Sequence, residues 1–280
     1  MSALLGLGLI GVSLVKLLFG ATSSVGVFSS AQAVQGVLGA VLIWVVLTGA
    51  AKRFFLTAFA RPANQLRVFL FPLLVWPLFL LYRFAIEQRG DVKVYLRRIT
   101  EGSLVEWLSF ILLLFSAWLL WQAASDWGTF KDRLVGRALS AVLLIAAMEE
   151  MSWGQMIFNW DSPALFDKYN IQHETGIHNL WFVHYHTWTI ASIVMTLFFV
   201  VSVISEFLRR YGRVKERSFA DILLPLGCTM TYFLMASIIY WFTVLAKSGI
   251  DLGGYFYTRE QEIGELFFYC GIFIHSMHLY

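Results

Sequence analysis

The stretch LSAVLLIAAMEEMSWGQ, residues 139–155, sets a long apolar run directly against two adjacent carboxylates, Glu149 and Glu150. Apolar runs of similar character recur along the chain, at about the 20-residue length that crosses the hydrocarbon core of a bilayer. A carboxylate at the edge of such a run is costly unless it has a partner or a function. The sequence therefore predicts a helical membrane protein with a polar site where this run ends.

The composition of the chain agrees with a membrane location. Hydrophobic residues make up 59% of the 280 residues and charged residues only 14%, whereas a soluble domain carries about 25% charged residues. The formal net charge is only +3, and no basic run is interleaved with aromatic residues, so nucleic acid is not expected as a partner. Cys228 and Cys270 both lie inside apolar runs, which argues against a disulfide framework.

The predicted fold class is all-α: a polytopic integral membrane bundle of about eight transmembrane helices, forming a single transmembrane domain over residues 1–280. Residues 52–67 are basic and partly aromatic, as is typical of an interfacial segment. Residues 154–187 are predicted to form a functional re-entrant or interfacial loop, in which Ser162 and Pro163 begin a short helix. The predicted spans are residues 3–19, 34–51, 68–86, 104–121, 134–153, 188–208, 219–247 and 261–278.

Lysine and arginine in short loops indicate the orientation of a membrane protein. The basic loops 52–67, 122–133 and 209–217 fall on one side, whereas the loop 154–187 on the other side carries only Lys168. The loop 87–103, with four basic residues, disagrees with this bias. The overall distribution of lysine and arginine predicts a cytoplasmic N-terminus. Membrane lipid is an expected partner of the bundle.

Alternating spans would bring the acidic helix ends to the extracytoplasmic face. Glu174 and His178 are four residues apart, so on a helix both would point to one side, where they could share a metal ion or where the acid could orient the imidazole. Such a mixed set suits zinc or manganese better than calcium. The residues expected on this face are Glu101, Glu106, Glu149, Glu150, Glu174, His178, Glu260, Glu262 and Glu265.

Structural explanations remain open for these residues. The pair Glu149 and Glu150 can end a helix at the headgroup level, with Trp153 in the aromatic belt, although the helix dipole opposes acids at a C-terminus. Ser103 and Glu106 have the spacing of a capping box. The loop histidines can equally be bonded to backbone groups.

Two motifs resemble the signatures of an uncharacterised family of bacterial polytopic membrane proteins. They are E-E-x-S-W-G-Q at residues 149–155 and Q-x-E-T-x-x-H-N-L at residues 172–180. The resemblance implies a bacterial cytoplasmic (inner) membrane and a shared site, without a reaction. A weaker similarity to CAAX-type intramembrane proteases is not adopted, because Gly154 stands where their motif has arginine and the third histidine motif is not matched.

The expected function is an integral membrane enzyme, metal-assisted or acid–base, that acts on a lipid, lipid-linked or membrane-peptide substrate. Glu150, Glu174 and His178 are the candidate catalytic residues and the candidate ligands of a divalent metal. Two alternatives remain open, a cation- or proton-coupled transporter and a non-catalytic membrane assembly subunit. Residues expected to bind substrate or to support the site are Glu106, Glu149, Ser152, Trp153, Gln155, Gln172, Asn179, Glu262 and Glu265.

Overall fold

The computed structural model divides the chain into two units, Met1–Ala60 and Arg61–Tyr280, and all described residues belong to the second. The predicted spans 3–19 and 34–51 lie outside the described residues. Within the described part the chain is helical and contains no β-strand, only an isolated bridge between Asn170 and Leu180. The described residues are 62–90, 95–96, 99, 104–158, 160–170, 175–177, 180–216, 218–252, 255–256 and 259–280.

Four helical stretches of the described part are long and apolar enough to cross a membrane. They correspond to α4 (Pro62–Glu87), α6 (Leu104–Ser125), the main part of α10 (Trp181–Arg210), and a broken stretch over Phe219–Lys247. This supports the predicted all-α membrane bundle. The predicted number of about eight spans is not confirmed. The other two long helices, α7 (Phe130–Glu150) and α13 (Gln261–Leu279), are not among these four stretches.

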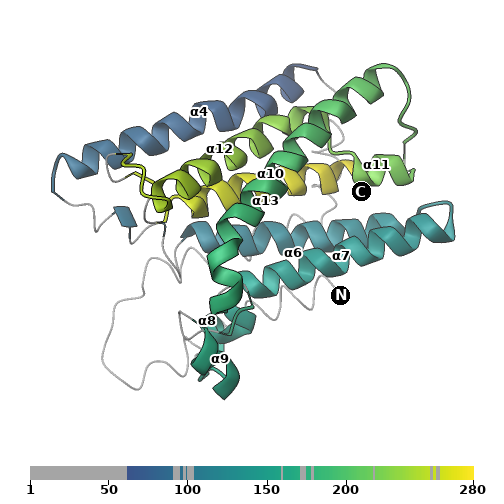
Figure 1. Ribbon diagram of the computed structural model, residues 1–280. Helices are drawn as coiled ribbons and strands as arrows, with labels where there is room; N and C mark the ends of the chain where they lie inside the picture. Colours follow the sequence, from purple (N-terminus) through teal and green to yellow (C-terminus); the bar gives the residue numbers. More distant parts are fainter. Residues whose placement is uncertain are drawn as a thin grey trace, which may run out of the picture. The chain divides into compact units, whose positions relative to one another are not determined.

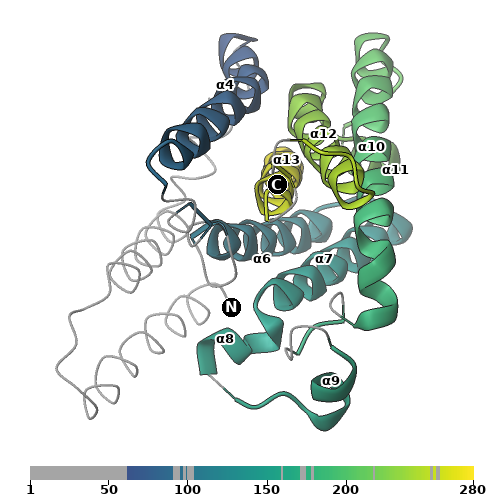
Figure 2. The ribbon, with the colours of Figure 1, turned by 60° about the vertical axis from the view of Figure 1, so that its left-hand side comes forward.

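The helix α13 is central to the packing of the described helices. It packs against α6 and against α12 (Met230–Lys247), while α6 also packs against α7. The helix α12 in turn contacts α10 and α4. Figure 2 shows α13 between α12 and α6, and Figure 1 shows α6 and α7 side by side. Groups at the start of α13 can therefore meet groups from several helices.

Two glycines of α13 allow the close approach of α12. A Cβ atom at Gly271 would lie 2.8 Å from the ring of Phe233, and one at Gly264 would lie 3.2 Å from the ring of Tyr240. Phe233 and Tyr240 are seven residues apart on α12, and Gly264 and Gly271 are seven residues apart on α13. Each of the two rings therefore packs over one glycine. The ring of Phe233 is also fixed by the ring of Phe268, 5.4 Å away. This contact sets the register between the two helices.

Replacing Gly271 with alanine is expected to lower the free energy of unfolding by about 1–3 kcal/mol, because the added methyl group overpacks a filled interior. Unfolding in mixed detergent and dodecyl sulfate micelles measures the change. The control is Gly128→Ala, since a Cβ there meets nothing within 4 Å. Equal unfolding midpoints for Gly271→Ala and the wild type would contradict this packing.

Three helices begin earlier than predicted. The helix α7 starts at Phe130 instead of residue 134. The helix α4 starts at Pro62 instead of residue 68, because proline is well suited to the first turn of a helix. Residues 62–67 of the predicted interfacial segment are therefore helical. The helix α10 starts at Trp181 instead of residue 188, so the predicted loop is shorter than expected.

The loop between α7 and α10 contains two short helices. These are α8 (Gln155–Phe158) and α9 (Ala164–Tyr169). The second confirms the predicted short helix, although its N-cap is Pro163 instead of Ser162. Large apolar side chains are exposed on this loop, among them Phe158 and Leu165. Such exposure is typical of a segment at a membrane interface.

The predicted helix 219–247 is broken into α11 (Phe219–Leu223), the 3₁₀ turn η3 (Gly227–Thr229) and α12. Pro225 lies in the break, where a helix would need a backbone N–H that proline lacks. Arg209 of α10 holds the break: it pairs with Asp221 at 2.7 Å and donates to the carbonyl of Leu224 at 2.7 Å. This brace lies at the end of the bundle opposite to the ends of α7 and α12.

Candidate functional site

The predicted site residues fall into two groups. Gln172, Glu174, His178 and Asn179 lie outside the described residues, so the predicted pairing of Glu174 with His178 stays a prediction. The described residues of the predicted site are Glu106, Glu149, Glu150, Ser152, Trp153, Gln155, Glu262 and Glu265.

Four of the described acids come together where α6 begins, α7 ends and α13 begins. The carboxylates of Glu106, Glu262 and Glu265 are close enough to Glu150 to interact with it electrostatically. We call these four residues the carboxyl cluster. They are far apart in the sequence and meet because α6, α7 and α13 alternate in direction and pack together. Alternation of the spans was the reason for expecting them on one face.

Two tyrosine hydroxyls hold two acids of the carboxyl cluster. Tyr269 of α13 donates to Oε1 of Glu150 at 2.9 Å. Tyr240 of α12 donates to Oε1 of Glu265. Each contact joins two helices, α13 to α7 and α12 to α13. Among the described residues, three carboxylates and one hydroxyl are the groups that act on Glu150, which is an unusual environment for a half-buried acid.

Neither Tyr269 nor Tyr240 was among the residues predicted for the site from the sequence. A signal for Tyr269 was present, because Glu262, Glu265 and Tyr269 are separated by three and four residues and so share one face of α13. No such signal exists for Tyr240, which lies on another helix and reaches Glu265 only through the packing of α12 on α13.

Basic residues approach the outer part of the carboxyl cluster. Arg259, just before α13, pairs with Glu262 at 3.2 Å and also acts electrostatically on Glu265. The acids of the cluster therefore have different surroundings: Glu262 has a basic partner, whereas Glu150 and Glu265 have tyrosine hydroxyls. Within the described residues, no three His, Cys, Asp or Glu side chains are arranged to hold a metal ion. A metal site formed with Glu174 and His178 stays a prediction.

Glu149 has a different role from its neighbour Glu150. Its carboxylate accepts hydrogen bonds from the indole of Trp153 and from the backbone N–H of Ile177, the latter at 2.8 Å. Gln155 accepts similarly from the N–H of Thr175 at 2.8 Å. The residues of the E-E-x-S-W-G-Q motif thus tie the distant part of the loop to the end of α7.

Glu150 and Trp153 do not lie on a common helix face. The helix α7 ends at Glu150, not at residue 153, because Ser152 and Trp153 have left-handed φ values of 45° and 55° and Gly154 follows at 94°. The chain therefore turns, and the indole of Trp153 folds back onto Glu149. Ser152 is buried inside this turn. Such backbone strain in non-glycine residues persists only where surrounding contacts hold it.

Hydrogen exchange is expected to distinguish the contact of Glu149 with Ile177 from the contact of Gln155 with Thr175. Glu149→Ala removes the acceptor of the Ile177 amide and should speed exchange there by about fivefold, given about 1 kcal/mol for one hydrogen bond. Gln155→Ala should do the same for Thr175 instead. Exchange measured by mass spectrometry in detergent compares the two variants. Equal protection of both amides in both variants would show that these side chains do not hold the loop.

A buried ion pair lies beside the start of α13. Arg83 of α4 pairs with Glu260, and both side chains are almost fully buried. The ring of Tyr255 lies 4.0 Å from the Arg83 guanidinium carbon, and the ring of Tyr95 lies 5.6 Å from it. Burial raises the pKa of the Tyr95 hydroxyl to about 12, against the opposing effect of Arg83. Arginine near the end of a membrane helix commonly reaches outward to the membrane surface, whereas Arg83 is buried in this pair.

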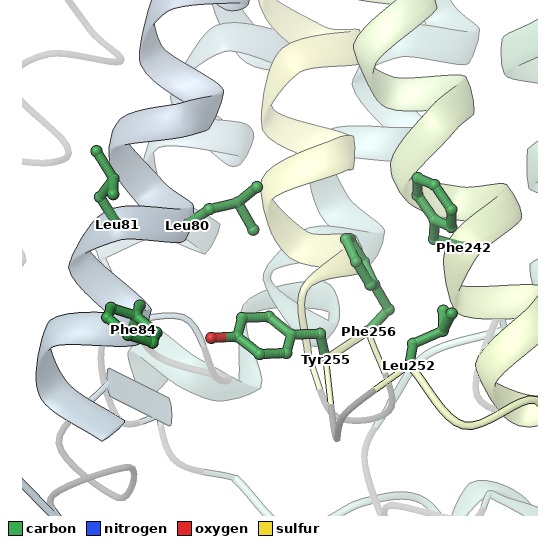
Figure 3. Close-up of a pocket in the computed structure, with 7 residues that line it drawn as sticks. All are labelled: Leu80, Leu81, Phe84, Phe242, Leu252, Tyr255 and Phe256. Carbon is green, nitrogen blue, oxygen red and sulfur yellow. The ribbon is translucent and has the colours of Figure 1, made fainter. Parts of the chain in front are cut away.

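An apolar groove of about 440 Å³ opens between α4, the end of α12 and the loop that leads to α13 (Figure 3). The α4 residues form one wall. Figure 3 shows Leu80 and Phe256 pointing toward one another across the groove. The lining residues are Leu80, Leu81, Phe84, Phe242, Leu252, Tyr255 and Phe256.

No protein-family model, curated protein or solved structure matches this chain. Function must therefore be argued from the site itself.

Proposed function

We propose that the protein is an integral membrane enzyme that uses Glu150 and Glu265 as a general acid–base pair on a lipid, lipid-linked or membrane-peptide substrate. The observation that carries this proposal is the carboxyl cluster, in which two half-buried acids are each held by a tyrosine hydroxyl. The reaction class we infer is hydrolysis or group transfer, in which one carboxyl group removes a proton and the other supplies one.

The two acids differ in the way that acid–base catalysis requires. Glu150 is surrounded by other carboxylates, whereas Glu265 also experiences Arg259. Neighbouring carboxyl groups in unlike environments are the usual source of an acid and a base within one site. The hydroxyls of Tyr269 and Tyr240 fix the direction of each carboxyl group, so they act as positioning residues.

The position of the carboxyl cluster supports a membrane substrate at the extracytoplasmic face. The opposite end of the bundle carries Arg209 and Arg210 in the last turn of α10, and Arg213 and Lys215 between α10 and α11. Such basic loops are usually cytoplasmic. We therefore place the cluster on the extracytoplasmic side of a bacterial cytoplasmic membrane, with the N-terminus inside.

The test is a comparison of purified variants in nanodiscs made from bacterial lipid extract, with products followed by mass spectrometry. The wild type is expected to convert at least one lipid component, and Glu150→Gln and Glu265→Gln are expected to lose this conversion. The matched control is Glu206→Gln, because Glu206 pairs with Arg210 on the surface of α10. Identical product profiles for the wild type and Glu150→Gln would refute the proposal. Metal analysis of the same samples tests whether Glu174 and His178 are ligands of a divalent metal.

A coupled cation or proton transporter is the second candidate, because buried carboxyl groups also bind cations and protons. Its weakness is the location of the carboxyl cluster at one end of the bundle. The middle of α13 is packed with aromatic rings, since Phe268 contacts Phe198 at 4.9 Å and Phe233 at 5.4 Å. Ion flux in proteoliposomes that is lost in Glu265→Gln would favour this candidate. A stoichiometric protein partner without turnover or flux would favour an assembly subunit.

A further inference from the structure

We infer that the groove between α4 and α12 binds a hydrocarbon chain of the substrate, and that this substrate is an amphiphile whose head carries no negative charge. The statement that the bound amphiphile is a substrate rests on the proposed function. The binding of a hydrocarbon chain in the groove does not depend on catalysis. The groove receives the hydrocarbon chain, and the carboxyl cluster selects the head.

The shape and lining of the groove fit a hydrocarbon chain. Its volume of about 440 Å³ lies within the range of about 300–1,000 Å³ that is usual for ligand sites. The lining is apolar, and Leu80, Leu81 and Phe84 come from a helix with the length and hydropathy of a membrane span. The groove is open to the outside of the bundle at Leu81 and Phe84, which are exposed. A chain can therefore enter from the lipid side.

The floor of the groove is built by a strained residue. Phe256 has a left-handed φ of 63°, which is rare for a bulky side chain. Its ring stacks on Phe242 at 5.0 Å and contacts Trp76 at 5.9 Å. These contacts hold Phe256 between α4 and α12, and strain of this kind is found where a surface is shaped for a ligand.

One end of the groove lies close to the start of α13. The ring of Tyr255 lines the groove and lies over the guanidinium of Arg83, and Arg83 pairs with Glu260. The helix α13 begins at the residue after Glu260 and carries Glu262 and Glu265. An amphiphile bound with its head at the Tyr255 end of the groove would place this head near the first turns of α13.

The charge of the cluster selects the head of the amphiphile. Glu150 has three carboxyl groups as electrostatic neighbours, and Arg259, which pairs with Glu262, is the cation that acts on the cluster among the described residues. Four carboxyl groups against one guanidinium leave an excess of negative charge, so a phosphate or carboxylate head placed beside Glu150 would be repelled. Hydroxyl groups and cationic groups can instead donate hydrogen bonds to these carboxylates. The geometry thus favours a neutral or cationic lipid over an anionic phospholipid.

Native mass spectrometry of the full chain in detergent tests the inference, with glucosyl-diacylglycerol as the neutral probe and phosphatidylglycerol as the anionic probe. The wild type is expected to retain the neutral probe at least tenfold better than the anionic one. Leu80→Trp fills the groove and should reduce retention of the neutral probe at least tenfold. Leu144→Trp, on the exposed face of α7, is the matched control and should retain it. Phe84→Ala, which widens the groove, should also retain it.

Equal retention by Leu80→Trp and Leu144→Trp, or a preference for phosphatidylglycerol, would overturn the inference. The unfolding midpoint of Leu80→Trp is measured in the same experiment. If it is lower than that of the wild type, two other observations decide the result: the retention of the neutral probe by Phe84→Ala, and the preference of the wild type between the two probes. The two proposals fail separately. Lipid retention that depends on the groove, with turnover unaffected by Glu150→Gln, would remove the enzymatic proposal and leave the lipid site.

Discussion

Arg83→Met is expected to lower the free energy of unfolding by about 3–5 kcal/mol, because it removes the basic partner of a buried carboxylate. The side chains of Arg83 and Glu260 are 4% and 0% exposed, so water cannot replace the lost partner. The pair also joins α4 to the start of α13, and the ring of Tyr255 packs on the guanidinium. Unfolding in mixed micelles with dodecyl sulfate provides the measurement.

Two further variants give this result its meaning. Arg83→Met/Glu260→Leu should recover most of the lost stability, because replacing both members of a buried pair with apolar side chains is often neutral or stabilising. Arg210→Met breaks the surface pair with Glu206, in which Arg210 is 75% exposed, and should cost less than about 1 kcal/mol. A cost for Arg83→Met no larger than that for Arg210→Met would show that the buried pair does not hold α4 in place.

Helix limits were predictable where an apolar run ends in polar residues. The predicted helices 104–121 and 261–278 correspond to α6 (Leu104–Ser125) and α13 (Gln261–Leu279) within four residues at each end. Both begin beside acidic residues, which interact favourably with the helix N-terminus. The same pattern led us to group Glu106 with Glu262 and Glu265, and the structure brings them together.

The errors have a common physical origin in local turns and side-chain direction. The predicted helix 134–153 continues past the two carboxylates to Trp153, but the backbone turns at Ser152, and composition does not encode that turn. Pro225 does signal a break within 219–247, yet the apolar run continues across it. Arginine near a helix end commonly reaches water, whereas Arg83 is buried. The acidic residue that captures it, Glu260, is distant in the sequence.

The adjacent acids Glu149 and Glu150 show how far the sequence could define the candidate site. Neighbouring residues on a helix point about 100° apart, so only one of the two could face the centre of the cluster. The structure assigns Glu150 to that position through Tyr269 and assigns Glu149 to the loop through Trp153 and Ile177. The periodicity set the alternatives, and helix packing made the choice.

Glu150→Gln is expected to reduce kcat of the proposed reaction by about 10²–10⁴-fold, the usual contribution of a general acid or base. Glutamine keeps the size of the side chain and an oxygen that can accept from Tyr269, but it cannot exchange a proton. Tyr269→Phe should cause a smaller loss of about fivefold, because it removes one hydrogen bond of about 1 kcal/mol that positions the carboxyl group. The turnover identified in nanodiscs measures both variants, with Glu206→Gln as the control.

The comparison of Glu150→Gln with Tyr269→Phe separates catalysis from structure. If Glu150 only stabilises the end of α7, both substitutions should lower the unfolding midpoint and change kcat in proportion to the loss of folded protein. If Glu150 transfers a proton, Glu150→Gln should unfold like the wild type and lose turnover, while Tyr269→Phe should keep the pH profile of the wild type at a reduced rate. A folded Glu150→Gln variant with unchanged kcat would exclude Glu150 as the acid or the base.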